Sequence, residues 1–186
     1  MAEPARRPAT YEDVLAAPEH LVAEILDGEL ILSPRPASPH AAAATALGEE
    51  LGPPFKRGRG GPGGWWILDE PELHLGRDVV VPDLAGWRRE RMPEMPEVAY
   101  FTLAPDWVCE VLSPSTARHD LTRKMRIYAR ERVSHVWLVE PLARWVEVRR
   151  LDGDTYRVIC TEGDDTRARL EPFDAIELDL AVLWMR

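Results

Sequence analysis

Apolar and polar positions divide the chain into short segments with two different periods. The apolar runs 21–26 and 29–34 flank Asp27-Gly28, a dipeptide that favours a two-residue β-hairpin turn. Residues 144–160 alternate with a period of two around Asp152-Gly153, which predicts a second antiparallel hairpin. Further strands are predicted in the segments rich in β-branched and aromatic residues, which are 65–75, 78–87, 97–113 and 134–141.

Three segments favour helices. Residues 11–20 predict a short helix, and the alanine-rich segment 38–51 predicts a longer one, with Ser38 as its N-cap and Pro39 at its first position. Residues 118–133 predict a helix of about four turns. The glycine-rich segment 58–64 predicts a loop, and it lacks the sequence pattern of a phosphate-binding loop. The segment 173–184 predicts a closing strand or short helix. This order predicts an α/β or α+β fold with a central mixed sheet.

Composition narrows the class of protein. A length of 186 residues with 45% apolar and 30% charged residues fits one soluble globular domain spanning 1–186. There is no apolar run of about 18 residues, which argues against a membrane span, and the first residues lack a secretory signal. Cys109 and Cys160 fit no metal-ligand spacing, so we expect buried free thiols and a cytoplasmic location. The net charge of −9 argues against a broad nucleic-acid-coating surface but leaves room for a narrow basic cleft.

An acid, Glu110, lies inside the apolar run 107–112. Alternation along a strand puts Glu110 on the same face as Val108 and Leu112. A carboxylate inside a covered sheet costs several kcal/mol unless it is paired, protonated or bound to a cation. Glu110 therefore needs a compensating group, either an arginine in a structural ion pair or the members of a functional site.

Two further residues can supply that site. Pro82 predicts a bend that exposes Asp83, and if the two strands are neighbours, Asp83 and Glu110 converge. Two close carboxylates attract a divalent cation, and oxygen ligands suit Mg²⁺ or Mn²⁺. Lys124 falls at the border of an apolar helix stripe, where its amine can reach along the sheet. Taken singly, Asp83 also fits a turn, and Lys124 a surface residue paired with Asp120; jointly the three residues favour a site.

Several stretches together resemble one family. They are "VPDLAGW", "WVCEVLSPST", "DLTRK" with Tyr128 four residues on, "VWLVEP", and "EILDGELILSPRP" followed by His40. This pattern is similar to the Uma-two family, and through it to the restriction-endonuclease-like fold of the PD-(D/E)XK nucleases. The resemblance implies that Asp83 and Glu110 are the two acids. It also implies that Lys124 replaces the lysine that the superfamily places at the position of Leu112.

The implied activity is that of a Mg²⁺- or Mn²⁺-dependent endonuclease that hydrolyses phosphodiester bonds of nucleic acid, with DNA expected as the partner. Asp83, Glu110 and Glu24 would be metal ligands, with the Val111 carbonyl as a possible addition. Lys124 would orient water or stabilise the transition state. His40 could reach the site or serve a structural role. A homodimer is expected, since two-fold nucleases use it to address both strands.

Two other functions stay open. The fold could be kept as a binding module with a vestigial site, in which Asp83, Glu110 and Lys124 form a salt-bridged cluster without metal. Arginines could then line a backbone-contacting groove, or they could form a solvated face offset by acids; they are Arg57, Arg59, Arg123, Arg126, Arg130 and Arg132. The apolar tail 180–185 could alternatively serve assembly.

Overall fold

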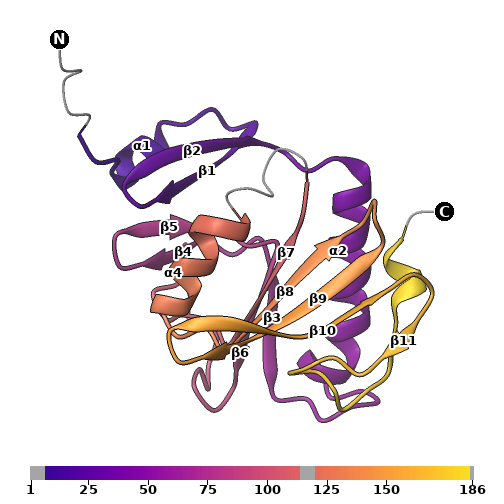
Figure 1. Cartoon of the computed structure of the whole chain (residues 1–186). Helices are drawn as coiled ribbons and strands as arrows, with labels where there is room; N and C mark the ends of the chain where they lie inside the picture. Colours follow the sequence, from indigo (N-terminus) through magenta and orange to yellow (C-terminus); the bar gives the residue numbers. More distant parts are fainter. Residues whose placement is uncertain (1–6, 114–119, 185–186) are drawn as a thin grey trace.

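A six-stranded mixed sheet forms the centre of the computed structural model, which describes residues 7–113 and 120–184 (Figure 1). The order of its strands is β10-β9-β8-β7-β6-β3, and β7 and β8 are parallel while the other neighbours are antiparallel. Their bounds are β3 Trp65–Asp69, β6 Leu84–Arg88, β7 Trp107–Val111, β8 His135–Glu140, β9 Trp145–Asp152 and β10 Thr155–Gly163. The predicted α+β class with a central mixed sheet is confirmed.

A second, four-stranded sheet is built from two hairpins in the order β2-β1-β5-β4. Asp27 and Gly28 both have positive φ (55° and 80°), the backbone that a type I′ turn requires, so the hairpin predicted there is confirmed. The strands are β1 Leu21–Leu26, β2 Glu29–Pro34, β4 Leu73–Leu75 and β5 Asp78–Val80. A short pair, β11 (Arg167–Ala168) with β12 (Leu178–Asp179), lies near the C-terminus.

Helices cover both faces of the six-stranded sheet. In Figure 1, α2 lies on one side and α4, with the smaller sheet, on the other. Successive side chains of β7 point to opposite faces of the sheet, so this strand contributes to both core layers. Trp107, Cys109 and Val111 pack in the cluster that contains α2, whereas Val108 and Leu112 pack in the cluster that contains α4. The helical elements are α1 Tyr11–Leu15, α2 Ser38–Leu51, the π-helical turns η1 Gly52–Lys56 and η2 Asp120–Lys124, α4 Met125–Arg130 and the 3₁₀ turn η3 Leu180–Leu183.

Several local predictions differ from the structure. The strand predicted at 97–113 is limited to β7, Trp107–Val111, and the helix predicted at 11–20 ends at Leu15. The segments 65–75 and 78–87 each divide into two strands that belong to different sheets, because Pro71 and Pro82 cannot donate to a ladder. The helix predicted at 118–133 ends at Arg130, and the left-handed backbone of Arg132 (φ 64°) prevents its continuation; residues 118–119 lie outside the described residues. The N-cap of α2 is Ala37 rather than Ser38.

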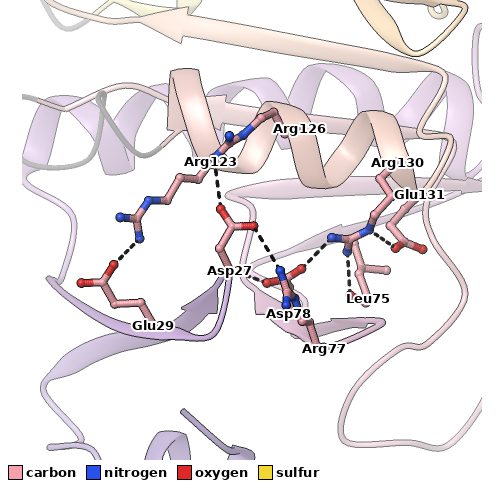
Figure 2. Close-up of polar contacts among 9 residues, drawn as sticks. All are labelled: Asp27, Glu29, Leu75, Arg77, Asp78, Arg123, Arg126, Arg130 and Glu131. Carbon is pink, nitrogen blue, oxygen red and sulfur yellow. Dashed lines mark hydrogen bonds and ion pairs between the residues drawn. The ribbon is translucent and has the colours of Figure 1, made fainter. Parts of the chain in front are cut away.

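A polar cluster fastens α4 to the turns of the two hairpins (Figure 2). Asp78, whose side chain is fully buried, accepts a hydrogen bond from the backbone N–H of Asp27 (2.6 Å). Its other oxygen lies 2.9 Å from Nη1 of Arg130, and Nη2 of the same guanidinium donates to the Leu75 carbonyl. This turn–helix cluster consists of Asp27, Glu29, Leu75, Arg77, Asp78, Arg123, Arg126, Arg130 and Glu131. Arg123, Arg126 and Arg130 each pair with an acid, as the alternative of a helix face offset by acids expects.

Neither a membrane-spanning helix nor a disulfide occurs within residues 7–113 and 120–184. In residues 7–113 and 120–184, no helix is long and apolar enough to cross a membrane. Both cysteines are free; Cys109 is buried as predicted, whereas Cys160 is partly exposed. Burial, followed by the charges of Asp83 and Glu110, raises the pKa of the Cys109 thiol well above its ordinary value, so this side chain packs as a neutral group.

Candidate active site

The chain leaves the small sheet and enters the large one through residues 81–83. Val81 lies outside both ladders, and its backbone groups are satisfied by side chains instead: its N–H donates to Oε1 of Glu24 (2.7 Å) and its carbonyl accepts from Nζ of Lys124 (3.4 Å). Pro82 has no N–H to satisfy. The bend predicted at Pro82 is therefore the point where the chain changes sheets, and it delivers Asp83 to the junction.

Asp83 directly precedes β6, which is the neighbour of the strand β7 that carries Glu110, as the convergence hypothesis requires. Leu84 pairs with Cys109 in the antiparallel β6–β7 ladder, and continuing this register by one residue brings Asp83 beside Glu110. Oδ2 of Asp83 accepts a hydrogen bond from the backbone N–H of Val111 (2.6 Å). Oδ1 lies 2.5 Å from Nε2 of His40, which donates to the carboxylate. Both carboxylate oxygens are thus oriented by groups outside the strand of Asp83.

Glu110 is compensated by two groups from the helical segment that covers its face of the sheet. The hydroxyl of Tyr128 donates to Oε1 at 2.5 Å, and Nζ of Lys124 lies 3.2 Å from Oε2. Glu110 is 2% exposed, so these contacts form away from solvent. Charged hydrogen bonds of this kind offset the cost of placing a carboxylate in the interior.

Lys124 lies between two acids rather than on the surface. It is 3% exposed, and its amine is 2.9 Å from Oε1 of Glu24 and 3.2 Å from Glu110. The prediction that the lysine points inward is confirmed, whereas the side chain of Asp120, its alternative partner, lies outside the described residues. Leu112 is buried in the core layer under α4, so the amine of this site comes from a different backbone element.

These side chains line one cavity of about 240 Å³, called the site cavity below. Glu24, Asp83 and Glu110 contribute three carboxylates, and Lys124 contributes one amine; three negative charges against one positive leave a net of −2 when all are ionised. The cavity wall consists of Val22, Glu24, Ser33, Pro34, Arg35, Pro36, Ala37, His40, Glu70, Val81, Asp83, Glu110, Ser113 and Lys124.

A second cavity of about 600 Å³ lies between α2 and the strands β3 and β6. His40, Asp83 and Glu70 line both cavities and so form a shared wall. The far end of the second cavity carries Lys56, which donates to the Ile67 carbonyl (3.0 Å), and Arg57. Within the described residues Arg57 makes no ion pair, so two positive groups border a space next to the acids.

The donor chemistry of the site cavity fits a divalent cation of the Mg²⁺ class. No three acidic, histidine or cysteine side chains within residues 7–113 and 120–184 are grouped closely enough to hold a metal ion as a set. Mg²⁺ does not need such a set, since one or two carboxylates with water and substrate phosphate suffice. Asp83 and Glu110 provide two adjacent carboxylates, and the net charge of −2 matches one divalent ion.

The family model described as "Uma2: Putative restriction endonuclease" matches residues 8–182. The chain belongs to the Uma2 family. A crystal structure of a "putative nuclease belonging to DUF820 from Anabaena variabilis" is similar in fold, with a TM-score of 0.76, 23% sequence identity, and coverage of 95% of this chain and 97% of that chain. No curated protein sequence matches this one. The predicted family and restriction-endonuclease-like fold are confirmed.

Several contacts of this Uma2 site were not predicted from the sequence, although His40 was named there as a residue that could reach the site or serve a structural role. His40 contacts Asp83 directly, and its other ring nitrogen, Nδ1, is buried without a hydrogen-bond partner in the described chain. A single histidine in a helix carries no pattern that would reveal this contact. Tyr128 was expected beside Lys124, but its hydrogen bond to Glu110 was not predicted. Arg35 and Glu70 also line the site cavity, and neither was identified from the sequence.

Tyr128 should link this Uma2 site to stability at alkaline pH. Burial, followed by the charge of Glu110, raises the pKa of Tyr128 well above its ordinary value of 10.0. Below pH 10 the phenol is neutral in both the folded and the unfolded chain, so the contribution of Tyr128 to the free energy of unfolding is fully present. Above it, the unfolded chain loses the proton first, so the folded state loses up to about 1.4 kcal/mol per pH unit for this one group.

Tyr128→Phe should therefore have two opposite effects. At pH 7 the free energy of unfolding should fall by about 1–3 kcal/mol, because a buried carboxylate loses a donor. Above pH 10 the free energy of unfolding should decline less steeply with pH than in the wild type. The difference in slope should be that of one titrating proton, up to about 1.4 kcal/mol per pH unit. Urea denaturation between pH 7 and 11 measures both, and equal slopes in the two proteins would contradict the assignment of Tyr128 as a buried neutral donor.

Proposed function

We propose that this protein is a metal-dependent endonuclease that hydrolyses phosphodiester bonds of nucleic acid, with DNA as the expected substrate. The observation that supports it is the site cavity, where three carboxylates and one amine meet from four separate segments of the chain. Membership of a family described as a restriction endonuclease agrees with this reaction. Burial of so many charges costs several kcal/mol, which a purely structural role would not require.

Asp83 and Glu110 are the proposed metal ligands, with Glu24 as a further candidate. A bound Mg²⁺ or Mn²⁺ supplies Lewis acidity toward the phosphodiester and the attacking water. The protein supplies orientation: the Val111 N–H and His40 hold Asp83, while Tyr128 holds Glu110. The contacts of Glu24 with the Val81 N–H and with the Lys124 amine both fall on Oε1, so Oε2 could take a metal while both contacts remain.

Lys124 is the proposed catalytic amine. Its ammonium group is held by Glu24 and Glu110 at the cavity wall, where it can orient the water or stabilise negative charge that develops on the phosphate. In the hydrolysis, a water oxygen would bond to phosphorus and give up one proton, the bond from phosphorus to the leaving oxygen would break, and the leaving oxygen would take up one proton. A homodimer in the cytoplasm completes the proposal, since two-fold symmetry would present one site to each strand.

The second candidate function is a binding module on the nuclease fold. The observation that favours it is the mutual compensation within the cluster: Lys124 already contacts two carboxylates, so the charges are partly balanced by the protein itself. In that case the fold would contact nucleic acid or a protein partner without cleavage.

A calorimetric titration of Mg²⁺ and Mn²⁺ separates these functions. The wild type should bind with a dissociation constant of about 1 mM or tighter, which is ordinary for a site with few protein ligands. Glu110→Gln should abolish the binding heat, because it removes one of two adjacent carboxylates.

Glu94→Gln is the matched control, because Glu94 is an exposed acid that lines neither cavity described above. It should bind metal as the wild type does. No metal-dependent heat in the wild type would refute the metal site and move the binding module ahead. Equal binding in Glu110→Gln would place the metal at some other position.

A further inference from the structure

The exposed rim of the site cavity carries a second pair of opposite charges. Arg35 follows β2 and Glu70 follows β3, and Nη1 of Arg35 lies 3.5 Å from Oε2 of Glu70. Their side chains are 56% and 43% exposed, whereas Glu24, Glu110 and Lys124 of the same cavity are buried. The cavity therefore has a buried floor with one cation and an exposed rim with another.

The two cations are held very differently. Lys124 lies within 3.2 Å of two buried carboxylates, and its amine also donates to a backbone carbonyl. Arg35 makes one long, solvent-exposed ion pair, together with a 3.3 Å hydrogen bond to the Glu19 carbonyl. Exposed ion pairs are weak, so Glu70 can be exchanged for another anion at little cost. A planar guanidinium matches the two free oxygens of a phosphodiester better than it matches one distant carboxylate oxygen.

The backbone of Glu70 is in an unusual conformation. Its φ is 43°, a left-handed conformation that glycine or asparagine adopts more cheaply than glutamate. Its N–H donates to the Asp83 carbonyl (3.0 Å), which ties the turn to the segment that carries the proposed metal ligand. This strained turn places an acidic side chain against Arg35 at the entrance of the site, which is the kind of outlier that accompanies function.

We propose that Arg35 is the residue that binds a substrate phosphate at the rim of the site cavity, and that Glu70 occupies Arg35 as an internal anion until the phosphate replaces it. The inference rests on the proposed function, since it assumes that the cavity receives nucleic acid. It assigns substrate recognition to a residue that lies outside the cluster of Asp83, Glu110 and Lys124.

The test is a double-mutant cycle on binding of a labelled single-stranded DNA oligonucleotide, measured by fluorescence anisotropy at low salt in EDTA, so that no cleavage occurs. Arg35→Ala should weaken binding about tenfold, the loss expected for a charge-assisted hydrogen-bond pair. Glu70→Gln should tighten binding about threefold, because the competing anion is removed while the side-chain shape is kept. The double variant should bind as Arg35→Ala does, because Glu70 acts through Arg35.

Matched controls separate this role from overall charge. Arg157→Ala removes an equal charge on β10, and Glu50→Gln removes one on α2; neither residue lines the cavities described above, and both variants should bind as the wild type does. Arg35→Lys should recover part of the lost affinity, because a lysine keeps the charge without the fork.

Two results overturn the inference alone: unchanged binding by Arg35→Ala while the wild type binds, or an equal tightening by Glu70→Gln in the Arg35→Ala background. The latter would mean that Glu70 acts by general repulsion. Failure of the wild type to bind the oligonucleotide in EDTA would overturn the inference, whereas the proposed function is decided separately by the metal titration and the cleavage assay.

Discussion

Asp83→Asn is expected to abolish metal-dependent cleavage while the protein stays folded. The amide keeps an oxygen that can accept from the Val111 N–H, so the local geometry survives. The negative charge and one of two adjacent ligand groups are lost. Because a bound cation contributes several kcal/mol to transition-state stabilisation, the cleavage rate should fall about a thousandfold or more. Nicking of supercoiled plasmid DNA in Mn²⁺, beside digestion of a single-stranded substrate, measures the rate.

Asp154→Asn controls for the change of charge. Asp154 is fully exposed at the β9–β10 turn, where it pairs with Arg132, and it is remote from the site residues in the sheet. Cleavage by this control should be unchanged. Retained metal-dependent cleavage in Asp83→Asn would refute the assignment of Asp83, and a loss that coincides with a lower unfolding free energy would point to a structural role instead.

Arg130→Met is expected to lower the free energy of unfolding by about 3 kcal/mol. Asp78 has no exposed side-chain surface, and the oxygen that faces Arg130 makes the 2.9 Å ion pair without an aligned hydrogen bond. Removal of the guanidinium leaves that carboxylate buried with the Asp27 N–H as its remaining polar contact. The turn–helix cluster in Figure 2 then loses the contact that joins α4 to the β4–β5 turn.

The same cluster offers its own control. Arg126 pairs with Asp27 at 3.1 Å, but its side chain is 73% exposed. Arg126→Met should therefore change stability by no more than about 1 kcal/mol. Introducing Asp78→Asn into Arg130→Met should recover part of the loss, because a neutral amide costs less to bury than an unpaired carboxylate. Urea denaturation measures all four proteins, and equal effects of Arg130→Met and Arg126→Met would contradict this account.

Much of the fold was predictable because its determinants are local. Asp27-Gly28 supplies the two turn residues of the first hairpin, so that hairpin was predicted with its turn. The second hairpin was also predicted, but its turn is Gly153-Asp154, one residue later than the predicted Asp152-Gly153, because Asp152 pairs with Thr155 as the last residue of β9. The segment 38–51 forms a helix over the predicted residues, since its alanines favour that state. The division of 65–75 and 78–87 between two sheets was not predicted, because pairing partners are chosen by packing far along the chain and not by strand propensity.

The candidate site divides in the same way. An acid in a buried strand, a Pro-Asp bend and an inward lysine are each visible in the sequence, because they violate the local expectation for their positions. His40 against Asp83 and Tyr128 against Glu110 violate nothing locally, so only the approach of α2 and α4 to the sheet revealed them.

The sequence by itself determined the hairpins, the long helix, and the acids and lysine that need partners, because turn chemistry, periodicity and the cost of burying a charge act at the level of single segments. The tertiary structure decided which residues pair with these acids and with the lysine. Two sheets meet at residues 81–83, and that junction brings Glu24 to Lys124 and Arg35 to Glu70 across long separations in the chain. The physical reason is that side-chain contacts at such a junction depend on how the sheets and helices pack, which no local pattern records.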